Sequence, residues 1–357
     1  MGELVERKKP PVATVPRDNE GELIARITKA FAVPRLNLGQ SRVPPRGWIG
    51  DDAAVIRGDG KKDWVVSCDF FLEGVHFLPD GRTPAKAIGY KALTRATSDL
   101  AAMGAQPRYF LLSLALPALR TGTWLEGFLA GLRRATQELG MALIGGDTTK
   151  KRDVAISITV IGEVWRGREL YRSGAKPGDL IYVSGTLGRA GLGLELMFRG
   201  LGGRQGMSGL LRRHLYPSIR TELGMWLATH RVASAMMDLS DGLSTDLRRL
   251  CAASKVGAKV WADWVPQVRI PDGVRKLRGM ARLSAERLAL DGGEDYELLF
   301  CVPPERVAKL RAAPGFSSIR QVGEIRSGTD AIIVGSDGER RELVAKGWDP
   351  FRRLQRR

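Results

Sequence analysis

The sequence lacks any apolar run of the ~18 residues that a membrane-spanning helix needs, so no membrane segment is expected. The first 20 residues carry charged side chains but no continuous apolar core, which excludes a secretory signal peptide. We expect residues 1–20 to form a disordered basic extension and residues 352–357 to form a basic tail.

Cysteine and histidine are scarce, with three residues of each in 357. Cys68, Cys251 and Cys301 lie far apart, without a CxxC pattern and without a histidine at metal-ligand spacing. This arrangement argues against a disulfide framework and against a structural zinc site. A reducing compartment, the cytoplasm, is therefore the expected location.

Two common catalytic motifs are also missing. The chain contains neither the GxxxxGK[ST] loop of P-loop enzymes nor the GxSxG turn of serine hydrolases. The stretch "VSGTLGRAGLG" (183–193) follows an expected strand and opens an expected helix, but its glycines do not have GxGxxG spacing. We attribute these glycines to close packing of the helix against a strand.

Basic residues outnumber acidic ones by 56 to 39, which gives a formal charge of +17. Part of the excess lies in Arg199–Arg220, which has no acid, and part lies in the last seven residues, "FRRLQRR". Such runs usually form solvated faces; binding of nucleic acid is a less favoured interpretation. A third interpretation is that the basic residues attract small polyanionic molecules.

Alternating strands and helices predict an α+β fold with mixed sheets, and the length predicts two domains, 21–165 and 166–351. In the first domain, helices are expected at 21–31, 83–105 and 123–140, and strands at 53–56, 64–71, 109–117 and 154–164. In the second, a strand is expected at 180–185, and further strands and helices within 236–254 and 292–302. The apolar residues of 83–105 have helical spacing and should be buried: Ile88, Ala92, Leu93, Ala96, Leu100 and Met103.

Several acids lie next to apolar stretches and next to small residues such as Gly, Ser or Thr. They are Asp51, Asp52, Asp69, Asp99, Asp147, Asp238 and Asp241. Carboxylates at the ends of core strands are costly unless a positive group satisfies them. Magnesium is the natural candidate because it takes oxygen ligands and keeps water or phosphate in its shell.

Each acid also has an ordinary interpretation. The Asp51–Asp52 pair could form a turn, and Asp147 could belong to a glycine turn. Asp99 could be a satisfied helix acid, and Asp241 or Ser240 could cap the helix that follows.

Three further residues are candidates for a binding site. His76 stands beside apolar residues, where a packed or surface role is the more common one. Glu294 follows two glycines that allow close approach of the backbone, and on its own it would be a loop acid. Trp348 either pins the tail to the body or offers a ring for stacking.

Taken together, the chain resembles the thiamine-monophosphate kinase family, a branch of the aminoimidazole-ribonucleotide-synthetase-like superfamily of ATP-using enzymes. The resemblance extends from about Gly21 to the C-terminus. The matching strings occur in the family's order: "IGDDAAV", "SCDFFLEGVHF", "YKALTRATSDLAAMGAQP", "LIGGDTT", "RSGAKPGDLIYVSGTLG", "DLSDGLSTDL" and "GGEDYELLF".

This resemblance implies the two-domain fold of that superfamily and a set of site residues. The implied ligands of several Mg²⁺ ions are Asp52, Ser67, Cys68, Asp69, Asp99, Asp147, Asp238 and Asp241. The implied contacts to ATP are Gly146, Asp147, Arg172 and Ser240, and those acting in phosphoryl transfer are Asp147, Arg172 and Asp241. The implied lining of the thiamine-phosphate pocket is His76, Glu294 and Trp348. One departure is Cys68, which stands where the family usually has Thr and removes a hard oxygen ligand.

The family's reaction moves the γ-phosphoryl group of ATP onto thiamine monophosphate, which gives thiamine diphosphate. Because the acceptor oxygen belongs to an ionised phosphate, the chemistry depends on positioning and charge neutralisation more than on a strong base. The resemblance also implies a homodimer with nucleotide near the N-domain interface. Two alternatives remain: another ATP-using enzyme of the superfamily, of the aminoimidazole-ribonucleotide or selenophosphate synthetase type, and a basic nucleic-acid-binding protein.

Overall fold

The computed structural model describes residues 19–30, 49–79, 81–311 and 317–351. Most of the expected N-terminal extension and the expected basic tail lie outside the described residues. Helix α1 (Glu20–Ala30) belongs to a unit separate from the rest. It begins with a reciprocal cap, in which Asn19 Oδ1 accepts from the backbone N–H of Glu22 and Glu22 Oε2 accepts from that of Asn19.

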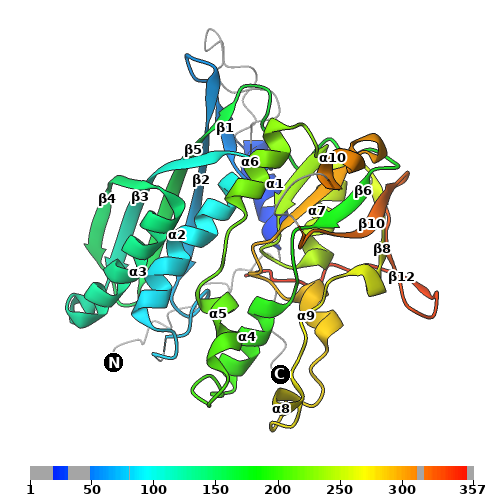
Figure 1. Cartoon of the computed structure of the whole chain (residues 1–357). Helices are drawn as coiled ribbons and strands as arrows, with labels where there is room; N and C mark the ends of the chain where they lie inside the picture. Colours follow the sequence, from blue (N-terminus) through cyan, green and yellow to red (C-terminus); the bar gives the residue numbers. More distant parts are fainter. Residues whose placement is uncertain (1–18, 31–48, 80, 312–316, 352–357) are drawn as a thin grey trace, which may run out of the picture. The chain divides into compact units, whose positions relative to one another are not determined.

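The described residues from 49 to 348 form one unit that contains two sheets (Figure 1). The first sheet has five strands in the order β1-β2-β5-β3-β4. Their bounds are Ala54–Ile56, Lys62–Leu72, Ala155–Trp165, Gln106–Leu116 and Ala142–Lys150. The β3–β4 pair is parallel and the other pairs are antiparallel. The four expected strands of this half are therefore present, and β4 is a fifth.

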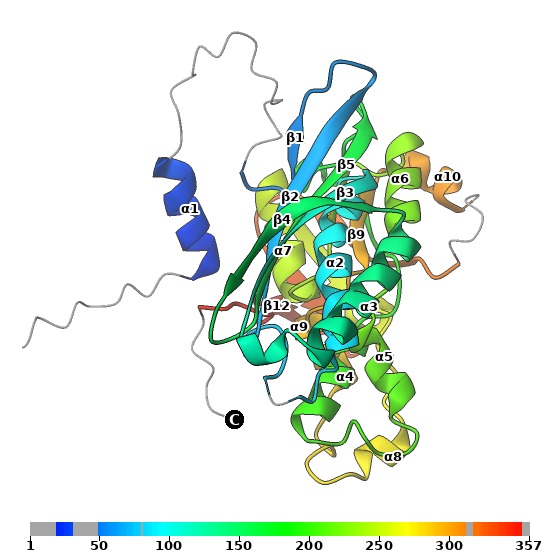
Figure 2. The same ribbon diagram turned by 90° about the vertical axis from the view of Figure 1, so that its left-hand side faces the viewer.

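Helices α2 (Ala85–Ala102) and α3 (Thr123–Leu139) cover one face of this sheet, and Figure 2 shows both on the same side. All six apolar residues expected to be buried in the first of these helices are buried. The two helices approach closely at glycines. A Cβ on Gly89 would lie 1.9 Å from the carbonyl oxygen of Phe128, and one on Gly131 would lie 1.8 Å from that of Lys86.

The opposite face of the five-stranded sheet is open. Every residue of the edge strand β4 is exposed, including the apolar Leu143 and Ile144. Phe70 on β2 is 63% exposed, and Tyr109 on β3 is 39% exposed. Apolar side chains of β2 and β3 are thus exposed on this face.

The second sheet has seven strands in the order β12-β11-β8-β10-β6-β9-β7. Their bounds are Arg340–Glu342, Ala331–Val334, Gly257–Trp261, Arg320–Arg326, Leu180–Val183, Leu298–Val302 and Ala235–Asp238. The β8–β11 pair is parallel and the other pairs are antiparallel. Helix α2 also packs against β7, so it lies between the two sheets and is buried on almost every side.

The helices of the second half are α4 (Arg189–Phe198), α5 (Ser208–Leu215), α6 (Thr221–Thr229), α7 (Leu243–Ser254), α8 (Asp272–Arg275), α9 (Ala285–Asp291) and α10 (Val307–Arg311). The α+β class with mixed sheets is confirmed. The boundaries of the expected domains stay a prediction. Among the described residues, no helix combines the length and apolar character needed to cross a bilayer.

Candidate active site

Three of the expected acids meet where the two sheets face each other. Asp52 precedes β1, Asp99 lies on α2, and Asp238 ends β7; one carboxylate oxygen of each lies within 4.8 Å of the others. The packing of α2 against β2 and β7 produces this convergence, because it brings Asp99 close to the other two acids. Three residues separated by almost 190 positions in the sequence therefore form one cluster.

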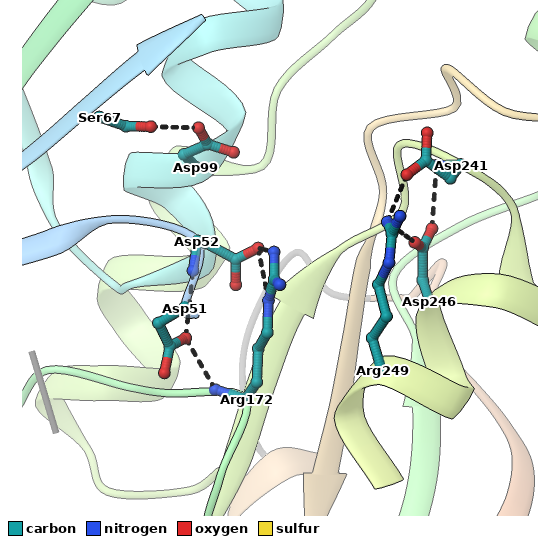
Figure 3. Close-up of polar contacts among 8 residues, drawn as sticks. All are labelled: Asp51, Asp52, Ser67, Asp99, Arg172, Asp241, Asp246 and Arg249. Atoms are coloured by element: carbon teal, nitrogen blue, oxygen red, sulfur yellow. Dashed lines mark hydrogen bonds and ion pairs between the residues drawn. The ribbon is translucent and has the colours of Figure 1, made fainter. Parts of the chain in front are cut away.

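Arg172 clamps this cluster from one side (Figure 3). Its Nη2 and Nε donate to Asp52 Oδ1 at 2.6 and 3.2 Å, and its backbone N–H donates to Asp51 Oδ1 at 3.0 Å. The second oxygen of Asp52, Oδ2, is buried and has no hydrogen-bond partner in the described structure. A buried carboxylate oxygen without a donor is costly, so this atom is free to accept a cation.

The electrostatics of the cluster favour a bound cation. Burial, together with the charge of Asp52, raises the pKa of Asp238 to about 7. Burial, followed by the charges of Asp69 and Asp238, raises the pKa of Asp99 well above its usual value. The all-oxygen donor set fits a hard divalent cation such as Mg²⁺.

Successive side chains of strand β2 point to opposite faces of the sheet, which separates its three candidate ligands. Ser67 and Asp69 pair with the buried Val160 and Ile158 of β5, so they face the helices. Ser67 Oγ donates to Asp99 Oδ2 at 2.6 Å. Cys68 lies on the exposed face instead, with its Sγ 3.3 Å from Ser157 Oγ. The structure thus brings Ser67 and Asp69 toward Asp99 but leaves the side chain of Cys68 away from the cluster.

Asp147 and Gly146 are not brought into this cluster either. They lie on the edge strand β4, where Asp147 is exposed and its Oδ1 accepts from the backbone N–H of Thr148 at 2.9 Å. Gly146 has a local explanation, because a Cβ there would lie 1.8 Å from the carbonyl oxygen of Leu112. Asp147 is part of a strand, so the glycine-turn interpretation is wrong.

Asp241 is held apart by an ion pair. Its carboxylate contacts the Nη1 of Arg249 on α7, and Figure 3 draws this pair together with Asp246. Asp246 Oδ2 accepts from the backbone N–H groups of Asp241 and Gly242 at 3.0 Å each. The helix start is therefore capped from inside by Asp246, and capping by the side chain of Asp241 or Ser240, one of the ordinary interpretations, is wrong.

The three expected pocket residues come from loops that meet beside the cluster. Glu294 N–H donates to the carbonyl oxygen of Ser240 at 2.7 Å, and Trp348 N–H donates to that of Asp241 at 3.0 Å. Glu294 has a left-handed backbone, with φ of 68°. His76 Nδ1 accepts from the backbone N–H of Leu72 at 3.0 Å. Burial, followed by the charge of Arg95, lowers the pKa of His76 to about 4, which makes it a neutral imidazole at physiological pH.

Glu294 anchors a buried charged group that sequence reasoning missed. Its Oε1 lies 2.7 Å from Lys91 Nζ, and its Oε2 lies 3.1 Å from His214 Nδ1. The Lys91 and His214 side chains are each 3% exposed. Burial alone would raise the pKa of Glu294, but Lys91 and His214 hold it well below its usual range. Glu294 is therefore a fixed anion.

Comparison with known proteins gives the family. The model described as "AIR synthase related protein, N-terminal domain" matches residues 50–164, and its C-terminal counterpart matches residues 176–335. The chain is 38% identical to the thiamine-monophosphate kinase of Escherichia coli (strain K12), over 87% of this chain and 94% of that one. The chain belongs to the thiamine-monophosphate kinase family. The Bacillus subtilis (strain 168) kinase is 33% identical, over 85% of this chain and 93% of the relative.

Solved structures of this family match the fold of this chain over most of its length. The structure of AaThiL complexed with AMPPCP and TMP is 30% identical, with a TM-score of 0.78 over 93% of this chain and 96% of that chain. The thiamine-monophosphate kinase from Stenotrophomonas maltophilia K279a is 37% identical, with a TM-score of 0.69 over 89% and 96%. The resemblance inferred from the sequence motifs is therefore confirmed.

In this kinase chain the glycine-rich segment 183–193 does not form a phosphate site. Asp295 occupies the start of α4, where its carboxylate accepts from the backbone N–H groups of Gly188 at 2.5 Å and Ala190 at 3.0 Å. A Cβ on Gly188 would lie 2.8 Å from the backbone of Leu288 on α9. The expected close packing is present, but its partner is a helix, not a strand.

Proposed function

We propose that this chain transfers the γ-phosphoryl group of ATP to thiamine monophosphate, giving thiamine diphosphate and ADP. The observation that carries the proposal is the cluster of Asp52, Asp99 and Asp238, with its unpartnered buried oxygen beside Arg172. The relatives named thiamine-monophosphate kinase and the related complex with AMPPCP and TMP support the choice of substrates.

Mg²⁺ is the proposed cofactor. Asp52, Asp99 and Asp238 would hold it, with Asp69 and Ser67 close by on β2. When bound, the cation supplies positive charge that offsets the repulsion between the donor and acceptor phosphates. Asp147, Asp241 and Cys68 stay predictions as ligands, as do Gly146 and Ser240 as contacts to ATP.

The protein's own groups then have distinct tasks. Arg172 orients Asp52 and offers a fixed guanidinium at the cluster. Glu294, His76 and Trp348 are the proposed lining of the thiamine-phosphate pocket. Glu294 is ionised and paired with Lys91 and His214, while the neutral His76 adds no charge. The acceptor phosphate oxygen is already ionised, so none of these groups has to remove a proton from it.

We also propose a cytoplasmic homodimer. The open face of the five-stranded sheet, with Phe70 and Tyr109 exposed, is the surface that a second copy would cover. Asp147 and Gly146 lie on the edge strand of this sheet, which supports their predicted contact with nucleotide near such an interface. Sedimentation velocity tests the dimer: Tyr109→Lys with Phe70→Lys should shift it to the monomer, and an unchanged dimer would contradict the proposed surface.

One assay tests the reaction. Purified protein is incubated with ATP, MgCl₂ and thiamine monophosphate, and thiamine diphosphate is measured by chromatography. The proposal requires turnover that depends on Mg²⁺. Absence of thiamine diphosphate, with turnover of a different acceptor of the superfamily, would assign the chain another activity.

A further inference from the structure

Helix α2 carries three charged residues on one face. Lys91, Arg95 and Asp99 are spaced by four positions, so their side chains follow each other along the helix. Asp99 belongs to the carboxylate cluster, and Lys91 is paired with Glu294 of the proposed thiamine-phosphate pocket. Arg95 lies between them and has no role in either group described above.

The charge of Arg95 reaches both neighbouring groups. Burial acts to lower the pKa of its guanidinium, but the negative charges of Asp69 and Asp99 on the cluster side raise it. The charge of Glu294, on the pocket side, raises it as well. In turn, the guanidinium lowers the pKa of His76, after the larger effect of burial. The side chain therefore lies between the carboxylate cluster and the proposed pocket.

The hydrogen bonding of Arg95 is incomplete. Its Nη1 donates to the carbonyl oxygen of Phe70 at 2.6 Å, and its Nη2 lies 3.4 Å from Asp69 Oδ2. Its Nε is buried and has no partner among the described residues. The guanidinium stacks over the ring of Phe71, 5.4 Å from its centroid, which fixes its orientation.

Lys91, one helical turn from Arg95, differs from it in how its charge is paired. Its ammonium is buried and is held by Glu294 at 2.7 Å, so its charge is balanced. Arg95 is 15% exposed and has only a loose carboxylate contact with Asp69. A planar guanidinium with unused donors, open to a site for phosphorylated ligands, is suited to bind phosphate.

We infer that Arg95 binds the phosphate group of thiamine monophosphate and positions it as the acceptor between the carboxylate cluster and the pocket. This inference rests on the proposed function. We favour the acceptor phosphate over the phosphates of ATP. The next charged residue along this face of α2 is Lys91, which is paired with Glu294 of the proposed thiamine-phosphate pocket. Arg172, on the other hand, faces Asp52 from a different segment.

Calorimetric titration of Arg95→Ala and Arg95→Gln with thiamine monophosphate, unphosphorylated thiamine and ADP tests this role. A lost charge-assisted contact should weaken thiamine monophosphate binding about tenfold or more. Binding of thiamine and of ADP should stay within about twofold of the wild type, because neither ligand presents the acceptor phosphate. Steady-state kinetics should show the KM for thiamine monophosphate raised and the KM for ATP unchanged.

Arg306→Ala is the matched control. Arg306 also donates its Nη1 to a backbone carbonyl, that of Arg231, but it lies on η3 (Pro304–Arg306), outside the proposed site. This variant should bind all three ligands as the wild type does. Arg95→Gln retains a donor for the Phe70 carbonyl, so it carries the test if Arg95→Ala does not fold by circular dichroism.

Two results would overturn the inference. One is an unchanged preference for thiamine monophosphate over thiamine in a folded Arg95 variant. The other is a loss confined to ADP or ATP, which would assign Arg95 to the nucleotide. Failure of the wild type to phosphorylate thiamine monophosphate would instead defeat the proposed function itself.

Discussion

Arg172 holds one oxygen of Asp52 with two donors and leaves the other oxygen of the same carboxylate buried without a partner. The contact fixes the direction of the carboxylate, because rotation would break both bonds to Oδ1. A carboxylate oxygen of Asp52 also lies within 4.8 Å of oxygens of Asp99 and Asp238, in the cluster proposed to hold Mg²⁺. Preorganisation of this kind reduces the cost of binding a metal or a phosphate.

Replacing Asp52 should remove the response to magnesium. In Asp52→Asn the amide can still accept from Arg172, but the site loses one negative charge, so turnover should fall on the order of 100-fold. Thermal unfolding with and without MgCl₂ gives a readout other than activity. The wild type should be stabilised by the cation and the variant much less. Asp272→Asn, an exposed acid at the start of α8, is the control. An equal magnesium shift in Asp52→Asn would contradict the assignment.

The pair of Lys91 and Glu294 should behave as a buried ion pair. Glu294→Gln leaves a buried ammonium without its carboxylate, and we expect a loss of about 3–5 kcal/mol in unfolding free energy. Adding Lys91→Met should restore most of that loss, since no uncompensated charge then remains. Binding of thiamine monophosphate should stay impaired in the double variant. Denaturant unfolding and calorimetry measure the two effects, and additive stability losses would show that the residues are not coupled.

Asp246 should be a structural residue despite its place beside Asp241. Asp246→Ala removes the acceptor for two backbone N–H groups at the start of α7, so we expect a loss of about 2–4 kcal/mol in unfolding free energy. Glu222→Ala, at an exposed acid in the first turn of α6, should change stability by less than about 0.5 kcal/mol. If Asp246→Ala were as stable as the wild type by urea unfolding, the cap would have no energetic importance.

Asp295 should make stability depend on pH. Burial raises its pKa to about 7, above the value of an unfolded aspartate, so the folded protein retains a proton that the unfolded chain releases. Its contribution is full below about pH 4 and is lost as the pH rises through about 7. Unfolding free energies measured across this range should fall less steeply with rising pH in Asp295→Asn than in the wild type. Parallel curves would exclude Asp295 as the titrating group.

Gly131 should tolerate no side chain. A Cβ would lie 1.8 Å from the backbone oxygen of Lys86, so Gly131→Ala must push α2 and α3 apart and should cost about 1–3 kcal/mol. The control is Gly209→Ala on α5, where no atom lies within 4 Å of the added Cβ. That variant should gain up to about 1 kcal/mol from its better helix propensity. Equal thermal stabilities of the two variants would contradict the close contact.

Much of the architecture could be predicted from local patterns. The spacing of Ile88, Leu93 and Leu100 predicts a buried helix, and the apolar runs predict the strands of the first sheet, because both periodicities are short-range. The convergence of Asp52, Asp99 and Asp238 could be proposed only from their shared context and from family motifs. Their actual contact depends on how α2 packs between two sheets, which no local pattern encodes.

Other parts of the site could not be predicted for identifiable reasons. The family motifs imply Asp147 as a ligand, whereas its position on the edge strand β4, in register with Ser113, depends on the folded sheet. Lys91 and Arg95 were not among the expected site residues, although their four-residue spacing to Asp99 was a usable signal. The pairing of His214 with Glu294 joins positions 80 apart, so only the folded chain reveals it.

The burial of α2 between the two sheets has a consequence for how the enzyme admits its ligands. A wide swing of one half away from the other would pull Asp99 from Asp238 and Lys91 from Glu294, dismantling the reaction centre each time it opened. We therefore expect ligands to enter and leave by movements that keep α2 in place between the two sheets.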